Sequence, residues 1–247
     1  MQRRQFLTGA VVGAATGAAL AGGSLAVVRR TTASPGQTSY SAMGEDLILV
    51  ALLRVVLKID RPTYLDIGAA DPVAVNNTYL LHTLGSRGVL VEPNPTYVER
   101  LRAVRPTDVT VGAGVGTGEA TEADYYVIKN APMLNTFSSE VAEERKRGGD
   151  VVERVVKMPL VPIMQVIDEH LHAAPDLLSI DAEGMDLDIV RSLDLTKYRP
   201  PVICAETKGP AYTHESTPLA QFLVTKGYIV TAGTLYNTIL VDRARVS

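Results

Sequence analysis

Apolar residues recur with two different spacings along residues 47–241. A helical spacing opens the series over residues 47–57, and short apolar runs typical of buried strands then alternate with further helical segments. The predicted strands cover residues 64–68, 88–92, 109–112, 124–128, 155–159, 177–181, 202–206, 228–231 and 238–241. The predicted helices after the first cover residues 77–84, 97–104, 163–171, 187–193 and 219–226. This order predicts an α/β fold with a Rossmann-like, mostly parallel sheet, helices on both faces, and an antiparallel pair of strands at the end.

The first thirty residues form a separate segment. Arg3-Arg4 precedes an uncharged, Ala- and Gly-rich run that extends from Phe6 to Val28, a layout typical of a twin-arginine export signal or a membrane anchor. Arg29-Arg30 balances the first pair of arginines, so the positive-inside rule does not orient the segment. We therefore expect either a membrane-tethered protein with its domain in the cytoplasm, or export by the twin-arginine route.

Composition limits the rest of the chain to a single domain. Residues 31–39 have the polar composition of a linker, and residues 40–247 suffice for one α/β domain with a full core. The net charge of -3, with no basic run interleaved with aromatic residues, disfavours a nucleic-acid partner. The lone Cys204 cannot form an internal disulfide. The four scattered histidines lack zinc-site spacing, so no metal site is predicted.

The candidate cofactor chemistry begins at the turn after the first predicted strand, residues 66–72. Gly68 lets the backbone pass close to a ligand at the carboxyl edge of the sheet. Glu92 ends the next strand, where an acid accepts the ribose hydroxyls of an adenosine ligand. Asp66 suits a cationic amino-acid moiety, and Asn77 offers a side-chain donor nearby. A single glycine in place of G-x-G-x-x-G favours a cofactor without phosphates over NAD or NADP.

A second group of polar residues follows later strands. Asp181 and Glu183 occupy alternate positions at the end of a strand and so point the same way. One of them could accept the proton of a hydroxyl during group transfer, although Asp181 could instead cap the next helix. Glu206 could bind acceptor hydroxyls, join Asp181 around a divalent cation, or form a salt bridge. His214 lies in a later loop, where it could act as a base or simply be solvated.

Several separated blocks of the chain form one larger pattern. They are residues 41–46, 66–72, 77–78, 91–95, 134–138, 178–184 and 199–207. This set resembles the FkbM family of S-adenosylmethionine (SAM) dependent methyltransferases over residues 41–242. The resemblance implies a seven-stranded methyltransferase sheet with an antiparallel last strand, SAM at the first two strand ends, and O-methylation of a sugar, glycan or secondary metabolite.

Motifs and resemblance together define the candidate site. The predicted cofactor residues are Asp66, Gly68, Ala69, Asp71, Asn77, Glu92, Pro93 and Asn94, and the candidate catalytic residues are Asp181, Glu183 and His214. Residues 130–150 have the charge and glycine content of a mobile surface segment over this site. Two other functions remain open. One is an exported, catalytically silent binding module, favoured by the leader because SAM is made in the cytoplasm; the other, ranked lower, is an NAD(P)-dependent oxidoreductase.

Overall fold

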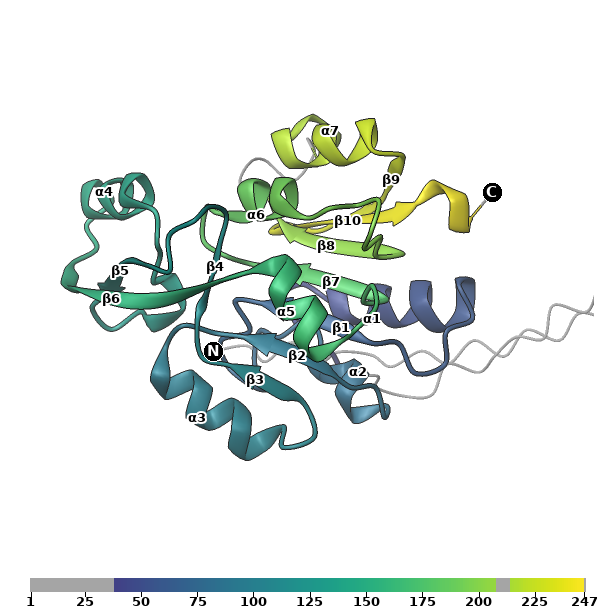
Figure 1. The fold of residues 1–247 in the computed structure, drawn as a ribbon, viewed down its shortest axis with the longest axis horizontal. Helices are drawn as coiled ribbons and strands as arrows, with labels where there is room; N and C mark the ends of the chain where they lie inside the picture. The colour runs from purple at the N-terminus through teal and green to yellow at the C-terminus, as the bar shows by residue number, and fades with distance from the viewer. Residues whose placement is uncertain (1–37, 208–213, 247) are drawn as a thin grey trace, which may run out of the picture. The chain divides into compact units, whose positions relative to one another are not determined.

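The computed structural model describes residues 38–207 and 214–246. The predicted signal or anchor over residues 1–30, and residues 31–37 of the predicted linker, lie outside this description. Seven strands form the main sheet in the order β3-β2-β1-β7-β8-β10-β9 (Figure 1). They are β1 (Tyr64–Ile67), β2 (Gly88–Val91), β3 (Val109–Val111), β7 (Leu177–Ile180), β8 (Val202–Glu206), β9 (Tyr228–Gly233) and β10 (Asn237–Asp242). Strand β10 is antiparallel to both neighbours while the other pairs are parallel, which confirms the predicted fold class.

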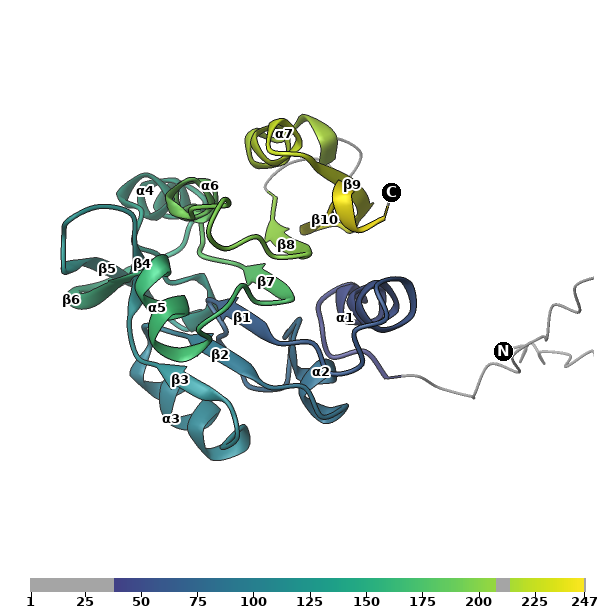
Figure 2. The ribbon, with the colours of Figure 1, turned by 45° about the vertical axis from the view of Figure 1, so that its right-hand side comes forward.

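Helices cover both faces of this sheet because side chains alternate along each buried strand. Tyr64 packs with α1 (Glu45–Val50), the π-helical turn η1 (Ala51–Val56), α2 (Tyr79–Thr83) and α3 (Pro95–Val104). Its neighbour Leu65 packs on the opposite face with α5 (Ile163–His170), α6 (Asp186–Ser192) and α7 (Pro218–Thr225). Figure 2 shows α1 and α2 on one side of the sheet and α5 and α6 on the other. Within the described residues, no helix is long and apolar enough to cross a membrane.

A second, smaller sheet lies beside the main one (Figure 1). It contains β4 (Gly114–Gly116), β6 (Val152–Pro162) and β5 (Glu122–Ile128), in that spatial order. Residues 130–150, predicted as a mobile surface segment over the site, contain the 3-10 turn η2 (Pro132–Leu134) and α4 (Ser139–Arg147), and Thr136 forms a bridge with Tyr126 of β5. Helix α4 begins where the Ser138 hydroxyl accepts the Val141 N–H at 3.2 Å and so caps the helix. The charged composition of this segment did not indicate a helix.

A buried polar cluster fixes the loop between β1 and α2. The side chain of Arg105 is fully buried and pairs through Nε with Asp108 at 2.8 Å. Its Nη1 donates to the side-chain oxygen Oδ1 of Asn76 at 3.2 Å, and its Nη2 donates to the Tyr64 hydroxyl at 2.9 Å. The Asn76 amide in turn donates to the Ala69 carbonyl at 3.0 Å. Because each partner is satisfied, this cluster holds the loop in one conformation.

Candidate active site

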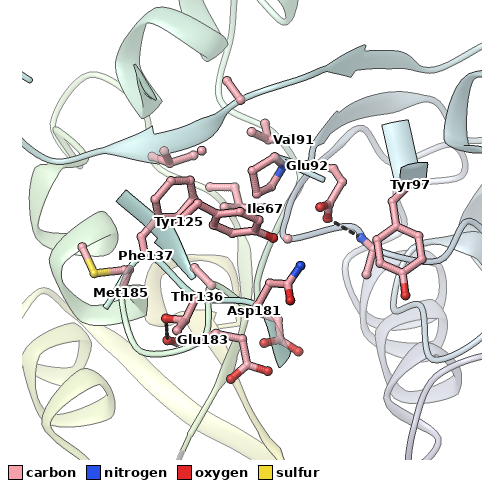
Figure 3. A pocket seen from close by; sticks show the side chains of 18 of the residues that line it. Ile67, Val91, Glu92, Tyr97, Tyr125, Thr136, Phe137, Asp181, Glu183 and Met185 are labelled. Atoms are coloured by element: carbon pink, nitrogen blue, oxygen red, sulfur yellow. Dashed lines mark hydrogen bonds between the residues drawn. The ribbon is translucent and has the colours of Figure 1, made fainter. Parts of the chain in front are cut away.

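A pocket opens at the carboxyl ends of β1, β2 and β7 (Figure 3). The space among its lining atoms, counted to include the open mouth, is about 570 Å³. The polar lining comes mainly from the ends of β2 and β7, and the apolar lining comes mainly from the smaller sheet and α6. The pocket therefore lies where open α/β sheets bind ligands.

Two loops meet at the floor of this pocket, and Gly68 makes the contact possible. Gly68 has φ +79°, and a Cβ there would lie 1.8 Å from the carbonyl oxygen of Asp181. The Asp181 N–H donates to the Ile67 carbonyl at 2.9 Å, so the loop after β7 continues the pairing with β1. Any side chain at position 68 would both strain the backbone and force these loops apart.

Glu92 ends β2 and is held from both sides. Its Oε2 accepts the Ala70 N–H at 2.9 Å, shown as a dashed line in Figure 3, and its Oε1 accepts the Asn94 N–H at 2.7 Å. Burial raises the pKa of Glu92 to about 7, because the charged form is poorly solvated there. Each carboxylate oxygen keeps a further lone pair that can accept a hydroxyl of a ligand.

The two acids predicted around the turn lie outside the pocket lining. Asp66 is buried, and its Oδ2 accepts the Thr78 hydroxyl at 2.6 Å. Burial raises the pKa of Asp66. Asp71 accepts the backbone N–H groups of Val73 and Ala74 and forms an ion pair with Arg100 at 2.6 Å. Both acids therefore support the loop that borders the pocket.

The other predicted cofactor residues have different positions. Pro93 lines the pocket, whereas Ala69 belongs to the core on the α1 face. Asn94 caps α3, with its side-chain oxygen accepting the Thr96 N–H at 3.1 Å. The Asn77 amide lies 3.5 Å from the Ser179 hydroxyl and thus points across the sheet toward β7. Of the predicted cofactor residues, Gly68, Glu92 and Pro93 are the ones that line the pocket.

Three carboxylates gather where β7 and β8 end. One carboxylate oxygen from each of Asp181, Glu183 and Glu206 lies within 4.8 Å of the other two. Asp181 is exposed at the open pocket, and the protein atoms packed around its carboxylate displace part of its hydration. This desolvation, followed by the charge of Glu206, raises the pKa of Asp181 well above its usual value. Oxygen ligands of this kind can bind acceptor hydroxyls or a hard divalent cation.

Helix α6, which follows this cluster, has no side-chain cap among the described residues, so the predicted alternative role of Asp181 as its cap is not observed; Asp186, its first residue, instead binds the loop before it. The Asp186 carboxylate accepts the N–H groups of Ala182 and Gly184 at 3.2 and 3.3 Å. Burial raises the pKa of Asp186 to about 6. Because Asp186 satisfies these backbone donors, the Asp181 carboxylate faces the pocket and can meet a ligand (Figure 3).

Glu183 is restrained by the segment between β5 and β6. Its Oε2 accepts Nη2 of Arg145 from α4 at 2.6 Å, and its backbone carbonyl accepts the Thr136 hydroxyl at 2.8 Å. Glu183 also has a positive φ of 48°, a conformation that surrounding contacts must maintain. Asp181 and Glu183 thus lie together beyond the end of β7 at Ile180, not at alternate positions of the strand, and Glu183 is oriented by a cation.

His214 lies apart from the pocket lining. It begins the short turn η3 (His214–Ser216), and its Nδ1 is 2.8 Å from the Thr238 hydroxyl. A Cβ placed on Gly233 would lie 2.1 Å from the His214 ring, so the ring packs tightly against β9. His214 therefore contacts the antiparallel strands β9 and β10 and does not line the pocket with Asp181 and Glu183.

The apolar wall of the pocket was not predicted from the sequence. Tyr125 from β5 and Phe137 pack with ring centroids 4.7 Å apart, and Met185 and Ile189 lie nearby in the lining. Phe137 could have been recognised as a site residue, because residues 134–138 are one of the blocks that resemble the FkbM family. Tyr125 had no comparable signal, because its face of β5 is set by pairing within the smaller sheet.

Comparisons with known proteins place the chain in context. The family model for the methyltransferase FkbM domain matches residues 66–230.

A methyltransferase FkbM structure from Methylobacillus flagellatus has 15% identity and a TM-score of 0.43; the match covers 73% of this chain and 43% of that one. The chain thus spans less than half of that protein. A precorrin-6y C5,15-methyltransferase from Geobacter metallireducens has 15% identity, a TM-score of 0.42, and coverage of 79% and 85%. Fibrillarin from Aeropyrum pernix, solved with natively bound SAM, has 16% identity, a TM-score of 0.38, and coverage of 79% and 72%. No curated protein matches the chain in sequence.

Proposed function

The chain belongs to the FkbM methyltransferase family, and we propose that it transfers a methyl group from SAM to a hydroxyl of a sugar, a glycan or a secondary metabolite. The observation that carries this proposal is the position of the Asp181, Glu183 and Glu206 carboxylates beside the pocket floored by Gly68 and bordered by Glu92. Carboxylates suit a neutral polyhydroxylated acceptor, since they accept hydroxyl protons and repel anions.

The pocket residues fit the methyl donor. The bare backbone at Gly68, where a Cβ would collide with the opposite loop, leaves room for a ligand to approach the floor closely. Glu92 is placed to accept ribose hydroxyls, and the acidic surroundings of Asp181 suit the positive sulfonium and ammonium groups. Bound SAM would supply an activated methyl group here.

The chain's own contribution is alignment and proton removal. When an acceptor hydroxyl is methylated here, a carboxylate of this chain would accept its proton. We assign proton acceptance to Asp181, because its carboxylate faces the pocket whereas Glu183 is engaged by Arg145. Glu183 and Glu206 would then orient the acceptor hydroxyls.

We also propose that residues 1–30 tether the enzyme to a membrane with the domain in the cytoplasm, where SAM is made. The alternative is an exported module that keeps the fold but binds a ligand without transferring a methyl group. A reporter fused to the carboxyl end of the chain separates the two, because it reports on which side of the membrane the domain lies.

Calorimetric titration of SAM and its demethylated product into the full chain tests the donor site. We expect micromolar binding that is lost in Glu92→Ala and kept in Glu153→Ala, a matched change at an exposed glutamate of β6. Transfer of a labelled methyl group to a panel of sugars and hydroxylated metabolites then tests the acceptor class. Absence of SAM binding by the folded wild-type chain would contradict the proposed function and favour the silent module.

A further inference from the structure

The helix formed by α1 and η1 presents an apolar face to solvent. It buries both of its acidic residues, Glu45 and Asp46, which are each 0% exposed. On its outer side Val55 is 72% exposed, and Ala51, one turn earlier, is also exposed. A shallow hollow on this side is lined by Val50, Arg54, Val55, Lys58 and Asp60. Leu49, Leu52 and Leu53 of the same helix are buried in the core, so Ala51 and Val55 are aliphatic residues left outside it. With both acids buried, the outer face carries no carboxylate of the helix itself and is suited to contact with another surface.

Basic residues border the same face. Arg54 forms an ion pair with Asp60 at 2.8 Å, and the exposed Lys58, which follows the helix, lines the same hollow. Two cations thus accompany one acid around the exposed valine. Aliphatic side chains flanked by lysine and arginine are the chemistry that binds the surface of a bilayer with anionic lipids.

The chain ahead of the described residues ends close to this helix in sequence. Residues 6–28 carry no charge and are long enough to enter a bilayer. Residues 29–37 separate them from the first described residue, and nine extended residues reach at most about 32 Å. A domain anchored through residues 6–28 would therefore be kept within a short distance of the lipid headgroups.

We propose that the outer face of α1 and η1, centred on Ala51 and Val55, docks onto a membrane that contains anionic lipids. The proposal rests on the prediction that residues 1–30 are a membrane anchor and is independent of the acceptor and of catalysis. A second copy of this chain fits the face less well. A two-fold contact sets the same patch against itself, and Lys58, the cation of the patch without an ion pair among the described residues, would then approach its own counterpart.

The absence of tryptophan from the sequence allows a direct test. A single reporter is introduced in the full chain by Val55→Trp, and the matched control is Val224→Trp in α7, on the opposite face of the sheet and 43% exposed. Both variants are reconstituted into vesicles of phosphatidylcholine and phosphatidylglycerol with brominated acyl chains. We expect the reporter at position 55 to shift to the blue and to be quenched several-fold more strongly than the one at position 224. Ala51→Trp provides a second reporter on the same face if Val55→Trp does not fold.

Three results would overturn the proposal. In the first, the protein floats with the vesicles but the reporters at positions 55 and 224 are quenched equally or not at all, so the tether holds the domain away from lipid. In the second, the full chain does not float with vesicles. In the third, the reporter at position 55 shifts to the blue with rising protein concentration in the absence of lipid, and the face then binds a second copy. None of these outcomes depends on SAM binding, so the proposed function is tested separately.

Discussion

The ionisation of Glu92 should make the stability of the ligand-free protein depend on pH, and Glu92→Gln should remove that dependence. Burial raises the pKa of Glu92 from 4.5 to about 7 in the folded protein. Between these pH values the folded protein keeps a proton that the unfolded chain has released. Stability is therefore lost as the pH rises from about 4.5 to about 7 and is constant above that range.

The magnitude follows from the difference between the two pKa values, 7 − 4.5 = 2.5. At about 1.4 kcal/mol for each pKa unit, the folded state loses about 3 kcal/mol over this interval. Glutamine has the same shape but does not titrate. One of the two backbone donors, on Ala70 or Asn94, would face its amide nitrogen, at a cost of about 1–3 kcal/mol that is the same at every pH. The stability difference between Glu92→Gln and the wild type should thus move in favour of the variant by about 3 kcal/mol between pH 5 and pH 8.

Thermal and urea unfolding of the ligand-free proteins across this pH range measure the effect. For a domain of this size, a change of about 3 kcal/mol corresponds to a shift in Tm of roughly 6–12 °C. Glu153→Gln, at an exposed position of β6, is the matched control and should run parallel to the wild type. If the curves for Glu92→Gln and the wild type are also parallel from pH 5 to pH 8, then Glu92 is ionised normally and our reading of its environment is wrong.

Three further predictions concern the pocket floor and the segment above it. Asp181→Asn should lower kcat by about 10²–10⁴-fold in steady-state kinetics, while a SAM titration should show that the affinity for the donor is retained. A similar loss in kcat and in SAM affinity would assign Asp181 to binding. Gly68→Ala should destabilise the fold by more than about 1 kcal/mol and abolish SAM binding. The control is Gly44→Ala: Gly44 also has a positive φ, but a Cβ there would meet no atom within 4 Å. This variant should be destabilised yet bind SAM normally in calorimetry. Arg145→Met should reduce thermal stability by about 1–3 kcal/mol through loss of the charged hydrogen bond to Glu183, and an unchanged Tm would show that the pair contributes little.

Local patterns were sufficient for the main sheet and for part of the site. The strands are short apolar runs, so their limits follow from sequence to within a few residues, as for Val202–Glu206. Gly68 and Glu92 were identifiable because the ends of parallel strands meet at one edge of the sheet. Both line the pocket.

The remaining parts depend on contacts between distant segments. Asp66 adjoins the glycine turn in sequence, but alternation along β1 directs its side chain toward Thr78 and away from the pocket. Arg105 reads as an ordinary helix-ending cation, and its burial depends on partners more than twenty residues away, such as Tyr64 at 2.9 Å. The pairing of Arg145 with Glu183 likewise requires α4 to reach over the end of β7. No periodicity encodes such contacts.

The ligand-free pocket is costly to maintain, and this cost is informative about its ligand. Burial raises the pKa of both Glu92 and Asp181, so the folded state opposes the charges that binding and proton removal require. A ligand hydroxyl that donates to either carboxylate would offset part of that opposition. A cationic ligand would stabilise the ionised carboxylates and return their pKa values toward the ordinary range. The same acids therefore favour a positively charged ligand over a neutral one of similar shape, which under the proposed function would be the methyl donor over its demethylated product.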